Sequence, residues 1–138
     1  MKLAAMSLLL ATTSISQAQV FRCEEPTGIA MWSMEGHRPG PDGFKGVKPV
    51  VIIAEKEMTI VWGDTKSAGG SEKAWKAIII NRNPRSVSAV ALDVGDAGSA
   101  TMLYTIDLKR RFLYMSMHKE GELLSASGTS AFVSACSN

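Results

Sequence analysis

The chain has 138 residues, two cysteines and a formal net charge of +2 at neutral pH. This length favours a single domain, and the small charge excess excludes a general nucleic-acid binder, which needs a marked basic surplus. Apolar residues make up 46% of the chain, enough for an ordinary hydrophobic core.

The first 18 residues have the three parts of a secretory signal peptide. Lys2 supplies the positive charge, residues 3–11 form an apolar run too short to cross a bilayer, and Ser16-Gln17-Ala18 carries small residues at the cleavage positions. The alternative is a buried N-terminal helix. Cleavage would leave residues 19–138, with a net charge of +1 after Lys2 is lost. We therefore predict a periplasmic or secreted protein whose mature chain has no transmembrane segment.

The two cysteines, Cys23 and Cys136, lie near the two ends of the predicted mature chain. An even pair in an exported domain predicts one disulfide. Closing so long a loop is expected to stabilise the fold by about 4 to 5 kcal/mol in the chain-entropy model. Two free buried thiols are the alternative.

Short runs of β-forming residues recur along the mature chain, and each ends at Gly, Pro, Asn, Asp or Ser. This pattern is typical of an all-β sandwich or barrel. We predict one antiparallel β domain of about eight or nine strands. The predicted strands are 20–24, 28–35, 49–54, 58–63, 74–80, 86–94, 101–108, 112–118 and 129–136.

Residues 36–48 contain four glycines and two prolines, so we predict a loop through which neither a strand nor a helix runs. Residues 71–80 fit a strand or a short helix that begins at Ser71 with a capping-box pattern. The β-branched run Ile78-Ile79-Ile80 favours the strand.

The lengths of the connections sort them between two ends of the domain. If consecutive strands are antiparallel, with Pro26-Thr27 as the first turn, connections must alternate between the ends. The long ones, 36–48, 64–72 and 119–128, then share one end with the turn 95–98. The short ones, 55–57, 81–85 and 109–111, share the other end, which also brings Cys136 close to Cys23.

The end with long loops is the predicted functional end, because binding residues usually sit on loops held by a rigid scaffold. Candidate contacts there are His37, Arg38, Phe44, Lys66, His118 and Glu120. The sequence favours a non-enzymatic binding module of the cell envelope that needs no cofactor and docks a protein or another envelope component. A small apolar ligand inside a barrel is a second version, which needs a cavity lined by residues such as Trp32, Trp62 and Trp75.

Other chemistry has weaker support in the sequence. A small hydrolase would use His37 or His118 with a loop carboxylate, but no catalytic motif surrounds either histidine. Copper could bind Met115, Met117 and His118, yet in a strand the two methionines face one side and the histidine the other. The basic turn 109–111 is interpreted as a solvated turn.

The export signal, the small antiparallel β domain and the terminal disulfide together resemble the periplasmic inhibitors of c-type lysozyme. The resemblance implies a small barrel that inserts a Ser/Gly-rich loop into the enzyme cleft. Ser125-Ala126-Ser127-Gly128 is the nearest match to that loop. It lies in the last connection rather than mid-chain, and Thr129-Ser130 follows it where the family has an aromatic residue.

Overall fold

Strands dominate the computed structural model, which describes residues 17–63, 73–95, 98–121 and 127–138. The strands are β1 (Gln19–Cys23), β2 (Thr27–Trp32), β3 (Pro39–Gly43), β4 (Pro49–Ile53), β5 (Glu57–Trp62), β6 (Lys73–Arg82), β7 (Ser86–Gly95), β8 (Gly98–Asp107), β9 (Phe112–Glu120) and β10 (Gly128–Ser137). A short 3-10 helix, η1 (Ser33–Glu35), follows β2. The all-β prediction is confirmed, and the strand favoured at residues 74–80 is present within β6 in place of the alternative short helix.

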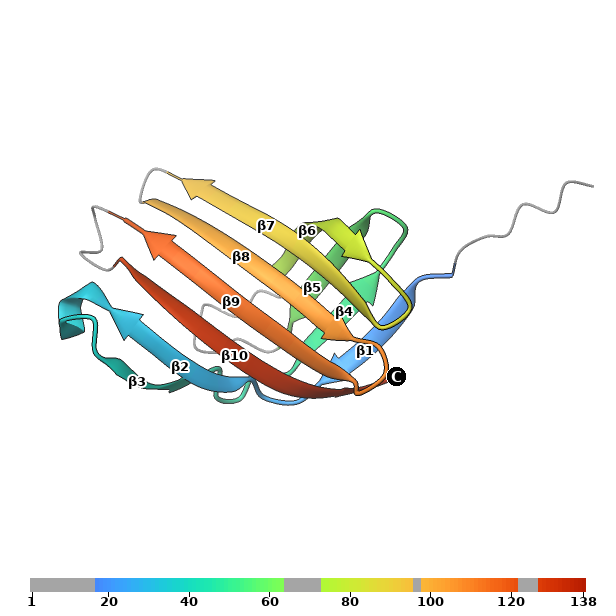
Figure 1. Cartoon of the computed structure of the whole chain (residues 1–138), viewed down its shortest axis with the longest axis horizontal. Helices are drawn as coiled ribbons and strands as arrows, with labels where there is room; N and C mark the ends of the chain where they lie inside the picture. Colours follow the sequence, from blue (N-terminus) through green and yellow to red (C-terminus); the bar gives the residue numbers. More distant parts are fainter. Residues whose placement is uncertain (1–16, 64–72, 96–97, 122–126) are drawn as a thin grey trace, which may run out of the picture.

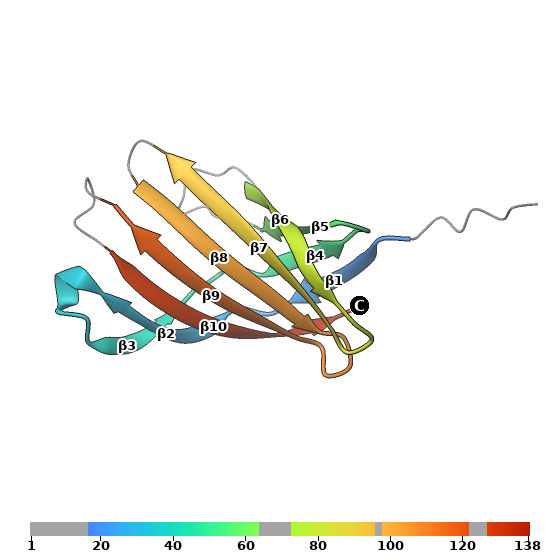
Figure 2. The same ribbon diagram turned by 45° about the horizontal axis from the view of Figure 1, so that its top comes forward.

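Eight of the strands close into an antiparallel barrel in the order β1-β4-β5-β6-β7-β8-β9-β10, with β10 returning to β1 (Figures 1 and 2). The fold is therefore a barrel rather than a sandwich. The closing seam is short, because β1 and β10 share only the register pairs Arg22–Ser137 and Cys23–Cys136. The strands β2 and β3 lie outside the closed ring, with β2 paired to β10 and β3 paired to β2.

Alternation along the strands builds the core. In β8, Met102, Tyr104 and Ile106 are buried, and the residues between them face outward. The strand β7 also alternates, but it turns Val87, Ala89 and Ala91 inward and leaves the larger Leu92 and Val94 exposed. Small side chains on one wall leave space inside the barrel.

The first two strands do not form the predicted hairpin. Both β1 and β2 run antiparallel to β10, β1 beside its last residues and β2 beside its first. The chain therefore keeps its direction from β1 to β2 and only bends at Pro26. The prediction of a turn at Pro26-Thr27 is wrong. This bend carries the chain from the barrel wall onto the outer hairpin β2–β3.

The prediction that residues 36–48 contain no strand is also wrong, because β3 lies within them. A proline removes a backbone donor, so it is tolerated in a strand whose edge has no partner. The strand β3 pairs with β2 alone among the described strands. Pro39 and Pro41 alternate along it, so their nitrogens face the same edge.

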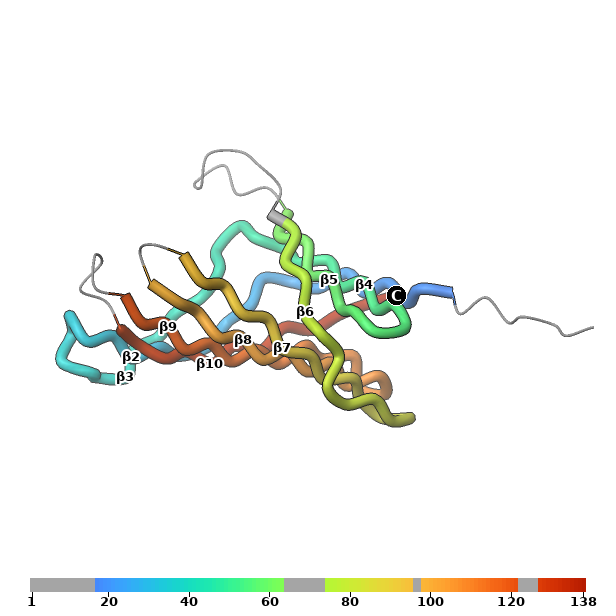
Figure 3. Tube along the Cα trace, turned by 90° about the horizontal axis from the view of Figure 1, so that it is seen from above, coloured from blue at the N-terminus to red at the C-terminus, as the bar shows by residue number. Residues whose placement is uncertain are grey.

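The strand β6 carries the wall from one side of the barrel to the other (Figure 3). Its register with β7 shifts between Ile79 and Asn81, a β-bulge that bends the strand. Before Ile78, residues 73–77 of β6 pair only with β5 among the described strands, and residues 91–95 of β7 pair only with β8. The wall is therefore split between β6 and β7 toward one end.

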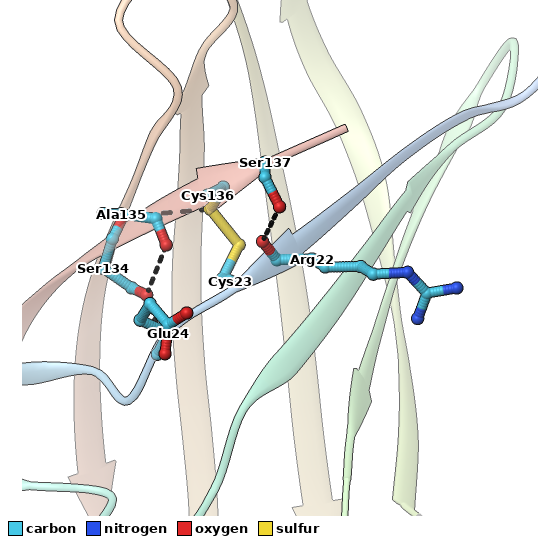
Figure 4. The surroundings of a disulfide bond; sticks show 7 residues. All are labelled: Arg22, Cys23, Glu24, Ser134, Ala135, Cys136 and Ser137. Atoms are coloured by element: carbon cyan, nitrogen blue, oxygen red, sulfur yellow. Dashed lines mark hydrogen bonds between the residues drawn. A yellow bond between two sulfur atoms is a disulfide. The ribbon is translucent and has the colours of Figure 1, made fainter.

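The predicted disulfide between Cys23 and Cys136 is present and joins the seam strands (Figure 4). Hydrogen bonds flank it: the Ser134 hydroxyl donates to the Glu24 carbonyl oxygen at 2.6 Å, and the Glu24 N–H donates to the Ala135 carbonyl oxygen at 2.8 Å. The short connections and the C-terminus gather at the end where β8 meets β9 through Asp107 and Phe112. At the opposite end, Lys119, Gly128 and Trp32 lie on adjacent strands.

Candidate functional site: an apolar pocket in the barrel

A pocket of about 200 Å³ occupies the barrel interior and extends toward the end with the long connections. Its lining is almost entirely apolar and comes from five barrel strands and the segment between β3 and β4. The lining residues are Phe44, Val47, Trp62, Trp75, Met102, Tyr104, Met115, Ser116, Met117, Lys119 and Phe132. An apolar cavity with a few polar groups is the usual form of a small-molecule site.

The segment that follows β3 folds into the barrel and forms one side of the pocket. The Phe44 N–H donates to the Pro26 carbonyl oxygen at 3.1 Å, which anchors the segment to the bend after β1. The Phe44 ring then packs against Trp62 at 4.8 Å and against Phe132 at 4.9 Å between ring centroids. Because these rings come from three separate segments, the pocket exists only once the barrel has closed.

The strand β9 supplies the opposite side. Alternation turns Met115, Met117 and Lys119 toward the interior, while His118 is exposed on the outer face. Methionine side chains are flexible and polarizable, and they adapt to the shape of a bound group. The two methionines and the histidine thus diverge, as the strand geometry predicts, which argues against a shared copper ion.

Three polar residues belong to the described lining of the pocket, Tyr104, Ser116 and Lys119, and two of them have polar groups with a neighbour. The Tyr104 hydroxyl donates to the Met102 sulfur at 3.3 Å, and burial raises the pKa of this tyrosine above its ordinary value. A thioether is a weak acceptor, so the hydroxyl is only weakly satisfied. The second group is the Lys119 ammonium, 5.9 Å from the centre of the Trp32 ring.

A second hollow, of about 220 Å³, lies in the split between β6 and β7. Lys76 and Asp93 give it a more polar lining than the main pocket. Trp75 and Met102 line both hollows, so they separate the interior pocket from the split in the wall.

The structure places the candidate contacts in different environments. Phe44 lies inside the pocket, as do Trp62 and Trp75, whereas Trp32 lies beside Lys119 and not in the lining. The other candidates are exposed: His37 and Arg38 follow η1, and His118 and Glu120 lie on β9. Lys66 lies outside the described residues.

The two histidines are on separate elements. The His37 N–H donates to the Trp32 carbonyl oxygen at 2.9 Å in the connection after η1, while His118 pairs with Thr101 and Thr129 in the sheet. Within the described ranges, no three side chains of His, Cys, Asp or Glu form a group that could hold a metal ion.

The Ser/Gly-rich segment that resembles the lysozyme inhibitors is described only in part, because Ser125 and Ala126 lie outside the described residues. The Ser127 carbonyl oxygen accepts a hydrogen bond from the Ser33 N–H at 2.8 Å. Gly128 opens β10, and a side chain there would overlap the Trp32 ring. Gly128 is thus packed between strands rather than displayed at a loop tip.

Several lining residues were missed by the sequence prediction: Val47, Met102, Tyr104, Met115, Ser116, Met117, Lys119 and Phe132. For β9 the sequence pattern could have identified them, because Met115, Met117 and Lys119 alternate onto the same face of the strand. Lys119 was instead assigned to the following loop, although β9 extends to Glu120.

No protein-family model matches the chain, and no curated protein matches it significantly. None of the helical segments among the described residues is long and apolar enough to span a bilayer. The functional inference therefore depends on the geometry of the pocket.

Proposed function

We propose that this chain is an exported binding protein that takes a small apolar molecule into the barrel pocket. The observation that carries the proposal is the apolar pocket of about 200 Å³ inside a closed barrel. An apolar cavity of about 150 Å³ holds one benzene. By proportion, this pocket suits a ligand with an apolar part of about eight carbon atoms.

Export is the part of the proposal that rests on residues 1–18, which carry the charge, apolar run and cleavage positions of a signal peptide. The disulfide supports it, because disulfides persist mainly in oxidising compartments. A soluble carrier of this kind would hold an apolar compound in the aqueous space of the cell envelope or outside the cell.

Binding is favoured over catalysis by the chemistry of the lining. The polar residues in the described lining of the pocket are Tyr104, Ser116 and Lys119. Tyr104 is level with Met115, and Lys119 is level with Ala100, so the tyrosine and the lysine are four residues apart along the β8–β9 ladder. At about 3.3 Å per residue their backbone positions are about 13 Å apart. The Tyr104 hydroxyl bonds the Met102 sulfur and the Lys119 ammonium lies beside the Trp32 ring, so the two groups have separate neighbours.

Methyl NMR of the methionines tests the proposal directly, because Met102, Met115 and Met117 line the pocket. We expect 1-octanol, added to protein recovered from the periplasm of an expressing host, to shift these three methyl signals saturably. The other methionine signals should move less.

A matched pair of variants locates the binding. Met117→Trp places an indole in the pocket and should abolish the shifts of Met102 and Met115. The neighbouring variant His118→Trp adds the same group to the outer face of β9 and should leave them intact. Absence of shifts in the unmodified protein, or equal shifts in both variants, would contradict the proposed function.

A further inference from the structure

Lys119 is the one charged residue in the lining of the pocket as described. We propose that the ligand is an amphipathic carboxylate, with its apolar chain or ring in the pocket and its carboxylate at the Lys119 ammonium. This inference rests on the proposed function and adds the chemical class of the ligand.

The position of Lys119 gives the ligand a direction. Lys119 pairs with Gly128, the first residue of β10, and so lies where the pocket reaches the end of the barrel. Met117 and Met115 follow it inward on the same face of β9. A carboxylate at Lys119 would therefore leave the rest of the molecule pointing along the methionines toward Tyr104.

The Lys119 ammonium is available to a ligand. Within the described part of the chain no carboxylate forms an ion pair with it. Its neighbour is the Trp32 ring at 5.9 Å, a distance at which a cation–π attraction is modest. A charge-assisted hydrogen bond to a carboxylate is stronger than either a neutral hydrogen bond or such a contact.

Trp32 holds this arrangement in place. Its ring lies so close to Gly128 that a side chain at that position would overlap it. The ring is thus fixed between β2 and β10, and the ammonium rests beside it at the entrance. Glu120, the next residue, is exposed on the opposite face of β9 and leaves the entrance without a competing carboxylate from that strand.

The Tyr104 hydroxyl offers the alternative position for a polar head. It is buried, and its one hydrogen-bond partner among the described residues is a sulfur, so it would favour an uncharged acceptor placed deep in the pocket. An anion is less suited to that depth, because a carboxylate loses much solvation there. The two positions predict different responses to substitution.

Three eight-carbon probes separate these possibilities: octanoate, 1-octanol and octylamine, titrated by calorimetry at neutral pH. We expect octanoate to bind about tenfold more tightly than octanol, the ratio that corresponds to one charge-assisted hydrogen bond of about 1.4 kcal/mol. Octylamine should bind most weakly.

Variants assign the head group. Lys119→Met keeps an apolar stem of similar length without the ammonium, and should remove the tenfold advantage of octanoate while leaving octanol binding unchanged. Lys109→Met, in the turn at the other end of the barrel, is the matched control and should change neither. Tyr104→Phe should leave octanoate binding unchanged.

The outcomes distinguish the two proposals. If none of the three probes binds, the proposed function fails. If octanol binds as tightly as octanoate, or if Lys119→Met has no effect on octanoate, the pocket binds apolar compounds but the carboxylate inference is overturned. A loss of octanoate binding in Tyr104→Phe alone would place the head deep in the pocket and would also overturn it.

Discussion

Breaking the disulfide is expected to destabilise this protein more than most single changes. Cys23 and Cys136 are 113 residues apart, so the bond closes nearly the whole described chain into one loop. The chain-entropy relation gives about 5 kcal/mol for a loop of this length. That loss is comparable to the entire stability of many small domains.

The structure adds a second reason for a large effect. The seam between β1 and β10 has two register pairs, and one of them is the cysteine pair itself. Without the bond, the seam would be held mainly by the hydrogen bonds that Glu24 makes with Ser134 and Ala135. Local opening of the barrel at this seam should therefore accompany the global destabilisation.

Urea unfolding followed by circular dichroism measures the effect. The oxidised protein is compared with the same protein in a phosphine reductant and with the double variant Cys23→Ser, Cys136→Ser. We expect the free energy of unfolding to fall by about 4 to 5 kcal/mol, with a steeper dependence on urea because the unfolded chain is no longer constrained. A loss below about 1 kcal/mol in both would refute the reasoning.

Two further changes test the packing of β2 and the turn between β8 and β9. A side chain at Gly28 would overlap the Ala131 carbonyl oxygen, whereas one at Gly40 meets no atom within 4 Å. Gly28→Ala should therefore lower the free energy of unfolding in urea by about 1 to 3 kcal/mol, and Gly40→Ala should change it little. Equal losses in the two variants would contradict this packing. Asp107 accepts the backbone N–H groups of Arg110 at 2.7 Å and Lys109 at 2.9 Å, and these hydrogen bonds, that of Arg110 first, hold the pKa of its carboxyl below the ordinary 3.8. Its contribution is thus present above that value and lost as the pH falls, so the unfolding temperature of Asp107→Asn should fall less between pH 5 and pH 2 than that of the unmodified protein, as thermal scans can check.

The barrel strands could be predicted because each one repeats the same local pattern. In residues 101–118, β-formers alternate around a polar turn, and the structure has β8 and β9 there. The disulfide followed from the same reasoning, since Cys23 and Cys136 are the only cysteines. The strands depend on residues that are neighbours in the sequence, and two cysteines allow one pairing.

The outer hairpin could not be predicted, because its existence depends on a partner strand. Pro39 and Pro41 exclude a central strand, but β3 is at an edge and needs donors on one side only. Likewise, nothing local to Pro26 distinguishes a hairpin turn from a bend that keeps the chain beside β10.

The sequence raised an interior pocket only as the second version of the binding hypothesis, and it indicated little of the lining. Hydrophobicity alone favours burying Leu92 and Val94, yet the structure exposes them at 71% and 78% and turns Ala89 and Ala91 inward. Which face of a strand lines a cavity is decided by the whole barrel, through its curvature and its opposite wall. Among the described candidates chosen for their presence in loops, Phe44 alone therefore lies in the interior.

The covalent link between the two ends also changes what a protease can do to this molecule. A single cut anywhere between Cys23 and Cys136 leaves two peptides that are still joined through their sulfur atoms. The pieces stay at a high effective concentration, so the strands can remain paired across the break. Release of a fragment would require a second cut or a reductant, which makes a nicked copy of this protein a durable species in an oxidising compartment.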